Sequence, residues 1–197
     1  MAEADVIVTG AKIYSSPVAT ALPAVTVAVD GAWPAGWVYV GYTLEPLKLT
    51  YNFDALEIMV QQTLNPIART RIKEEAMFET VLAEHFAANL ALAMAGTSST
   101  TNAVSGTPGY EDFYVGGDYN LPVKQWGFEG SYVSAAGNRH PIRVFIWRGN
   151  AQEGGELDYD RENPAGIPLK IKALADTGKT IGQHLMRIQR VTAPALP

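Results

Sequence analysis

The sequence predicts a mainly β protein with one long hairpin and one helix. Three observations lead to this fold class. Glycine, proline and tyrosine are frequent, with 18, 12 and 9 copies, and they either punctuate strands or suit a half-buried sheet. Apolar residues alternate with polar ones over long stretches, which is the period of a strand. One Ala/Leu-rich stretch instead repeats at helical spacing.

Residues 1–35 are expected to form an extended arm. It contains "DVIVTGAKIYSS" and "AVTVAVDG", two stretches rich in β-branched residues, and the second ends in a turn signal. A short strand, "GWVYVGY" at 36–42, follows between glycines. We therefore expect an extended arm and one short strand before the first long alternating pattern begins.

A long hairpin is the strongest prediction. Leu47, Leu49, Tyr51 and Phe53 alternate with polar residues. A second alternation, of Leu56, Ile58 and Val60, follows at once in the opposite phase, and "TLNPIAR" then interrupts it. A further alternating stretch then runs over 71–82, which at about 3.3 Å per residue reaches roughly 40 Å. The usual strand has about five or six residues. The pair therefore outgrows a small domain, with its tip expected at residues 62–70.

The helix is expected directly after this hairpin. Phe86, Leu90 and Met94 recur at a spacing of four, and Gly96 stands where a left-handed C-cap is wanted. Ala88 and Ala91 add a flank of small residues that a close neighbour can approach. A helix that is apolar on nearly every side predicts two packing partners, its own sheet and another surface.

The rest of the chain is expected to add strands and long loops to a single domain, residues 1–197. Strands are predicted near 123–133, 142–147, 169–174 and 184–188, and "AAGNRH" is predicted as a hairpin turn. Residues 96–109 and 149–166 are expected to be long loops, and 190–197 a C-terminal tail. The total is about eight strands and one helix.

Composition excludes several classes of function. The net charge is −5, with no block of like charge longer than two residues, so tight binding of DNA or RNA is not expected. Cysteine is absent, which excludes disulfides, thiolate metal sites and thiol nucleophiles. The uncharged stretch 13–29 is interrupted by Pro17 and Pro23, and a spanning helix needs about twenty mostly apolar residues. The acidic start lacks the basic end of a signal peptide, so no membrane association is expected.

Patterns that suggest chemistry each have a plainer interpretation. Gly178-Lys179-Thr180 lacks the upstream glycine of a phosphate-binding loop, so a turn is expected there. Asp158, Asp160 and Glu162 alternate as calcium ligands do but lack the rest of the EF-hand pattern. The histidines have no ligand at metal-binding spacing, and no GxSxG elbow occurs. We therefore predict a protein that is not an enzyme and has no cofactor and no metal.

The features in the first half of the chain follow a particular order. A W-x-x-x-G-x-T entry at Trp37, Gly41 and Thr43 leads to a strand ending in "VQQ", a proline-containing tip, a strand carrying "EE", and "LAE" before an Ala/Leu helix. This order resembles that of the major tail (tail tube) proteins of long-tailed bacteriophages, and "IPLKIKALADTGKTIG" resembles their closing strands. The resemblance covers Trp37 to Gly96 and Ile167 to Ile188.

The resemblance implies a β-sandwich or barrel-like subunit with a flanking helix. Six copies would form a ring, and stacked rings the tube through which DNA leaves the virion. Partners would be the chain itself, the tape measure, tail terminator and distal tail proteins, and DNA only in transit. The protein would be made in the host cytoplasm and located in the virion tail.

Three sets of site residues follow from this expectation. The hairpin tip would contact the next ring, together with the arm and tail, and the helix would pack between subunits. A negatively charged bore would let DNA slide past, whereas Arg69, Arg71 and Lys73 would pair with neighbouring subunits. The three sets are bore-lining Glu57, Glu75 and Glu79, taken to share the non-core face of the hairpin; tip residues Thr63, Leu64, Asn65, Pro66 and Ile67; and helix residues Phe86, Ala88, Leu90, Ala91 and Met94.

Two alternatives remain open at this point. One is a tube of the same architecture in a contractile secretion system or a tail-like particle. The other is a monomeric β-sandwich that binds carbohydrate, with Trp126, Trp147 and tyrosines as stacking platforms.

Overall fold

The computed structural model describes residues 10–117, 120–134, 137–152, 154, 157, 159 and 164–192. Within them the chain is mainly β, with ten strands and one short helix. In chain order these are β1 Lys12–Ser16, β2 Val38–Gly41, β3 Lys48–Ile58, β4 Ala68–Leu82, α1 Ala87–Ala93, β5 Thr97–Thr101, β6 Tyr110–Tyr114, β7 Lys124–Val133, β8 Arg139–Ala151, β9 Ile167–Ala173 and β10 Met186–Arg190.

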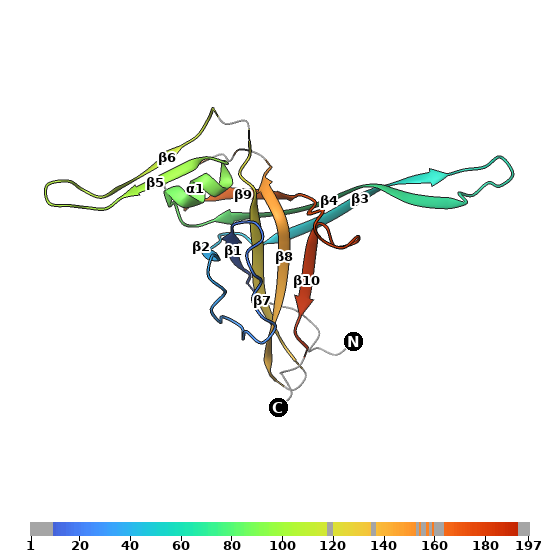
Figure 1. Ribbon diagram of the computed structural model, residues 1–197, viewed down its shortest axis with the longest axis horizontal. Coiled ribbons are helices and arrows are strands. Elements are labelled where there is room, and N and C mark those ends of the chain that lie inside the picture. Colours follow the sequence, from blue (N-terminus) through green and yellow to red (C-terminus); the bar gives the residue numbers. More distant parts are fainter. Residues whose placement is uncertain are drawn as a thin grey trace.

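Eight strands form one bent antiparallel sheet, and strand β8 makes the bend. The order is β2-β1-β7-β8-β9-β4-β3, with β10 paired to β8. The middle of β8 pairs with β10, whereas its last three residues, from Gly149 to Ala151, pair with β9. Strands β9, β4 and β3 consequently cross the layer that contains β7, β8 and β10 (Figure 1). The two layers make a β-sandwich with α1 at its side, as the resemblance implied.

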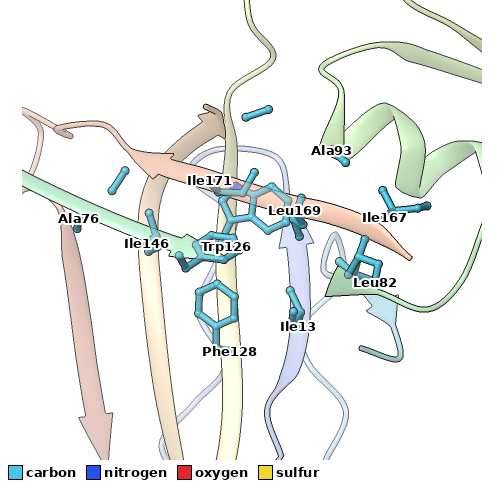
Figure 2. Packing of buried hydrophobic residues seen from close by; sticks show 14 residues of the cluster. Ile13, Ala76, Leu82, Ala93, Trp126, Phe128, Ile146, Ile167, Leu169 and Ile171 are labelled. Carbon is cyan, nitrogen blue, oxygen red and sulfur yellow. The ribbon is translucent and has the colours of Figure 1, made fainter. Parts of the chain in front are cut away.

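The core fills the space between the two layers (Figure 2). Phe78 on β4 meets Trp126 and Phe128 on β7, with ring centroids 5.3 and 4.4 Å apart and the rings edge-on. Leu169 and Ile171 on β9 are fully buried beside them. Burying each large apolar side chain contributes about 2 kcal/mol, so this cluster holds the crossed layers together.

The predicted alternation of the long hairpin is confirmed where the hairpin lies on the sandwich. Its buried positions on β4 are every second residue from Ala76 to Leu82. On β3 the pattern holds for Leu49, which packs against the core, but Tyr51 and Phe53 are 40% and 47% exposed. Both aromatic residues lie on the predicted side, since Tyr51 is opposite the buried Ala76, but the expectation that the core covers them is wrong. Strand β3 is the last strand of the sheet, and Phe53 lies opposite Glu74, where the hairpin leaves the sandwich.

The segment between β1 and β2 covers the other face of β1, β7 and β8. The strand expected from Ala24 is wrong, since this stretch forms turns. The reason is a buried guanidinium: Arg143 donates to the carbonyl oxygens of Ala24 at 3.3 Å and Val27 at 2.6 Å. A strand would use those carbonyl groups for pairing, whereas here they satisfy a charge.

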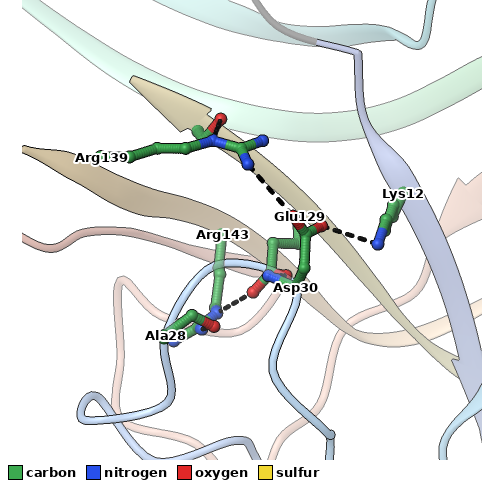
Figure 3. Close-up of polar contacts among 7 residues, drawn as sticks. Lys12, Ala28, Asp30, Glu129, Arg139 and Arg143 are labelled. Atoms are coloured by element: carbon green, nitrogen blue, oxygen red, sulfur yellow. Dashed lines mark hydrogen bonds and ion pairs between the residues drawn. The ribbon is translucent and has the colours of Figure 1, made fainter. Parts of the chain in front are cut away.

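The guanidinium is also ion-paired within the sheet (Figure 3). Arg143 Nε lies 2.7 Å from Glu129 Oε2, and both side chains are almost completely buried. The backbone N–H of Asp30 donates to the other oxygen of Glu129 at 3.1 Å. Lys12 and Arg139 hold the Asp30 carboxylate at 2.6 and 3.1 Å. The Lys12 hydrogen bond is the main reason that the pKa of Asp30 is lowered.

Gly127 allows the same segment to approach the sheet. A Cβ atom there would lie 2.4 Å from the ring of Trp33 and 3.0 Å from the ring of Trp37. Trp33 also stacks on Tyr14, with ring centroids 4.1 Å apart. The tryptophans therefore require a residue without a side chain beneath them.

We expect Gly127→Ala to destabilise the subunit by about 1–3 kcal/mol, the usual effect of overpacking. The measurement is urea unfolding followed by tryptophan fluorescence. Gly10→Ala is the matched control, because a Cβ at Gly10 meets nothing within 4 Å. Equal midpoints for the two variants would contradict the assigned packing.

The helix is shorter than its pattern indicates. It begins at Ala87, after an extended Phe86, and ends at Ala93. Glu84 and His85 are held outside it, because the Glu84 carboxylate accepts the N–H of Tyr42 and the His85 ring donates to the carbonyl oxygen of Ala165. These contacts stop the helix from starting earlier.

The expectation that Gly96 supplies the left-handed C-cap is also wrong. The left-handed residue is Ala95, with φ 53°. Gly96 is instead needed because β6 passes close to it: a Cβ at this position would lie 2.4 Å from both the Phe113 ring and the Tyr114 carbonyl oxygen.

The Ser/Thr-rich stretch after the helix is not the loop that its composition indicates. Thr97–Thr101 forms β5 and pairs with β6, so residues 97–114 make a second hairpin. Its β-branched threonines suit a strand even though every residue of β5 is exposed. Residues 1–9 of the arm, 193–197 of the tail, and the calcium candidates Asp158, Asp160 and Glu162 lie outside the described residues.

Candidate assembly surfaces

The hairpin of β3 and β4 extends far beyond the sandwich (Figure 1). Its outer half carries large apolar side chains that the subunit leaves uncovered. They are Tyr51, Phe53, Leu56, Ile58, Met59, Leu64, Ile67 and Ile72, all between 40% and 97% exposed. A concentration of exposed apolar residues on one projection is typical of a surface that contacts another protein.

The tip of this hairpin is residues 59–67, slightly earlier than expected. Ala68, Arg69 and Thr70 belong to β4 and pair with β3, so placing them in the tip is wrong. A hydrogen bond from the N–H of Ile67 to the carbonyl oxygen of Ile58, at 2.9 Å, closes the tip. The predicted tip residues lie together at the end of the projection and are all exposed: Thr63, Leu64, Asn65, Pro66 and Ile67.

One of the three acidic candidates lies on the other face of the hairpin. Strand β3 runs unbroken to Ile58, so Glu57 falls on the same side as Leu49, opposite Arg69. Glu75 and Glu79 share the face that points away from the core. The prediction of one shared face is wrong for Glu57. The alternation predicted to restart after Phe53 does not restart: β3 continues there, and the irregularity is a bulge at Ile72 on β4, which has no partner on β3.

Glu75 and Glu79 are each paired with lysine inside the subunit. The ammonium groups of Lys172 and Lys73 lie 2.7 and 3.2 Å from Glu75, and that of Lys48 lies 2.6 Å from Glu79. The hydrogen bond from Lys172 is the main cause that lowers the pKa of Glu75, and that from Lys48 lowers the pKa of Glu79. This face carries alternating charge and is not uniformly acidic.

We expect the Glu75 carboxyl group to titrate below its ordinary value of 4.5. Because the folded pKa is lowered, its pairing supports the hairpin above about pH 4.5 and is lost as the pH falls through the lowered pKa. Lys172→Met should raise the Glu75 midpoint, measured by carbon NMR of the side chain. Lys12→Met, on β1, is the control and should leave the Glu75 midpoint unchanged. An equal shift of that midpoint in both variants would contradict the Lys172–Glu75 pair.

The helix borders an open groove on the opposite side of the subunit from the hairpin tip. The groove has a volume of about 660 Å³ and lies between α1, β2 and the start of β7. Its apolar lining includes Val38, Phe86, Ala88, Ala91 and Leu92, of which Val38 and Phe86 are 63% and 53% exposed. The predicted packing residues Leu90 and Met94 turn the other way and pack against the core.

Other candidate sites have structural roles. Residues 177 and 178 form a turn in which Asp176 accepts the N–H of Gly178, and no helix follows Thr180. Trp126 and Trp147 are 1% and 7% exposed, so their proposed role as carbohydrate-stacking platforms is wrong. Within the described part of the chain no cluster of three or more acidic or histidine residues is placed to hold a metal. Nor is any helix there long and apolar enough to cross a membrane.

A family model described as phage tail tube protein matches residues 1–195. The chain belongs to this family. A search among curated proteins gave no match. Membership of the phage tail tube protein family confirms the resemblance seen in the sequence and extends it over the arm and the middle of the chain. The family is one of viral structural proteins.

Sequence reasoning missed two features of this tail tube protein. One is the β5–β6 hairpin, which projects on the same side as α1 (Figure 1) and whose signal was hidden by its polar composition. The other is the Arg143–Glu129 pair. Its signal was available, because a hairpin closed at Ser134 and Asn138 places residues 129 and 143 directly opposite each other.

Proposed function

We propose that this chain is the structural virion protein that polymerises as stacked hexameric rings into the phage tail tube, the conduit for DNA during ejection. The observation that carries the proposal is the family match over residues 1–195. The projecting hairpin supports it, because its exposed apolar end has no partner inside the described subunit. The tube ends would meet the tape measure, tail terminator and distal tail proteins.

The free edge of the sheet supports assembly side by side. β3 is the last strand of the sheet, and its outer edge has no partner strand among the described residues. Eleven residues of unpaired edge are a liability for a soluble protein unless another strand covers them. Pairing with a neighbouring copy would remove the edge and continue the sheet around a ring as an inner barrel.

The outward face of β3, β4 and β9 suits a bore for DNA in transit. Lysine side chains there hold the carboxylates of Glu75 and Glu79. Unpaired lysine side chains would bind the phosphates of DNA, whereas lysines that are paired with carboxylates hold a passing duplex only weakly. We assign Glu75 and Glu79 to the bore, and Glu57 to the opposite face of the projection.

Electron microscopy of the purified protein tests the proposal. Rings or tubes with six subunits per turn are expected. A compact monomer that persists at high protein concentration would overturn it. Detection of the chain in infectious particles separates a phage tail from a secretion tube of the same architecture.

We expect Ala88→Arg to block assembly more than it unfolds the subunit. Ala88 is exposed on α1, so the change in unfolding free energy should stay within about 0.5 kcal/mol. A bulky charge would nevertheless keep a neighbour away from the helix, as would Ala91→Arg. The measurements are circular dichroism and negative-stain imaging, with Ala103→Arg as an exposed control. Normal tubes from both helix variants would contradict this role of α1.

A further inference from the structure

Two uncovered apolar surfaces lie on opposite sides of the subunit. One is the hairpin end, where Met59, Leu64 and Ile67 are 59%, 97% and 58% exposed. The other is the groove beside α1, with Val38 and Phe86 on its rim. Figure 1 shows the hairpin tip at one end of the long axis and α1 on the other side of the sandwich. No subunit can therefore cover its own groove with its own hairpin.

We infer that the groove beside α1 receives the β3–β4 hairpin end of a second copy of this chain. The inference rests on the proposed function, because it assumes that copies assemble. The shapes of the two surfaces fit, since the hairpin end is a narrow convex projection and the groove is a concave space of about 660 Å³. Pockets of about 300–1,000 Å³ enclose a few side chains well.

Charge favours this pairing. Glu84, Glu111 and Lys124 line the groove, so two carboxylates face one ammonium group there. Each carboxylate accepts one backbone N–H, from Tyr42 at 3.2 Å and Ala87 at 3.0 Å. Neither forms an ion pair with another residue in the described ranges. The hairpin end brings Arg69, whose guanidinium has only a loose 3.6 Å contact with Glu57. Docking would place this cation beside the groove carboxylates.

The positions of the two surfaces also determine the symmetry of the contact. Because donor and acceptor surfaces lie on opposite sides, the contact is heterologous: each copy inserts into one neighbour and receives another. Such a contact repeats through a whole ring or along stacked rings. A different tail protein would meet the tube only at its ends and would leave most grooves empty. The second hairpin, β5–β6, is not the inserted segment, because it already packs against α1 of its own subunit and projects from the same side as the groove.

The absence of cysteine makes a cross-linking test direct. The variant Leu64→Cys/Ala88→Cys carries one thiol at the hairpin end and one in the groove. Treating assembled protein with a flexible bismaleimide should give a covalent ladder in denaturing electrophoresis. Each single variant should give dimers at most. Leu64→Cys/Ile181→Cys is the matched control, since Ile181 is 90% exposed but lies outside the groove, and it should give no ladder.

The outcomes separate this inference from the proposed function. Tubes of the double variant without a ladder would overturn the docking and leave the tube intact, whereas absence of tubes from the unmodified chain would overturn the proposed function itself. A ladder supports the docking: one that stops at the hexamer assigns it within a ring, and a longer one assigns it between rings. Ile67→Cys/Ala95→Cys provides a second pair in case the first fails to assemble, and absence of a ladder from its tubes counts against the docking equally.

Discussion

Arg143→Met should destabilise the subunit by about 3–5 kcal/mol, a large share of the roughly 5–15 kcal/mol that holds a typical domain folded. The side chain of Arg143 is completely buried, and the substitution leaves the Glu129 carboxylate, 1% exposed, without its cation. It also removes the donor that satisfies the carbonyl oxygens of Ala24 and Val27. Loss of one member of a buried pair costs more than the pair contributes, because the remaining charge stays desolvated.

The measurement is urea unfolding at a protein concentration where the subunit is monomeric. Arg139→Met is the matched control on the same strand, since Arg139 makes an exposed pair with Asp30 at 3.1 Å. Exposed pairs contribute at most about 1 kcal/mol. The double variant Arg143→Met/Glu129→Leu should recover part of the loss, but not all, because the carbonyl groups of the covering segment still lack donors. Equal effects of the two single variants would show that the buried pair does not anchor this segment.

Alternation predicted the parts of the fold that lie on the sandwich. Phe78 and its neighbours on β4 were found because a strand on a core has a period of two. The same rule failed for Phe53, since alternation shows which residues share a side but not whether anything covers that side. Only the length of the pattern indicated that the hairpin would leave its own subunit.

Helical periodicity overestimated the helix for a related reason. The spacing of Phe86, Leu90 and Met94 is correct for one face, yet contacts made by Glu84 and His85 with distant residues keep the preceding backbone extended. Such contacts join segments far apart in the chain, so no local pattern contains them. The position of Glu57 was predicted wrongly because two separate alternations, ending at Phe53 and beginning at Leu56, lie on one continuous strand, β3.

Replacing residues 59–67 by Asn-Gly should abolish tube formation while the subunit remains folded. The two-residue turn suits this hairpin because Ile58 and Ala68 are directly paired, and Asn-Gly favours the tight turns that match strand twist. The change in unfolding free energy should be within about 0.5 kcal/mol, because most of the removed side chains are exposed. Assembly should fail because Leu64 and Ile67 are removed, and they supply the apolar end of the projection.

Sedimentation with negative-stain imaging measures this loss, and urea unfolding verifies the fold. The matched control replaces Leu64 and Ile67 with serine and keeps the tip at its original length. If apolar contact is what the tip provides, the serine variant should assemble as poorly as the truncated one. If only the reach of the hairpin matters, the serine variant should form normal tubes. Normal tubes from the truncated chain would mean that rings stack without the tip, and the exposed apolar end would then need another partner.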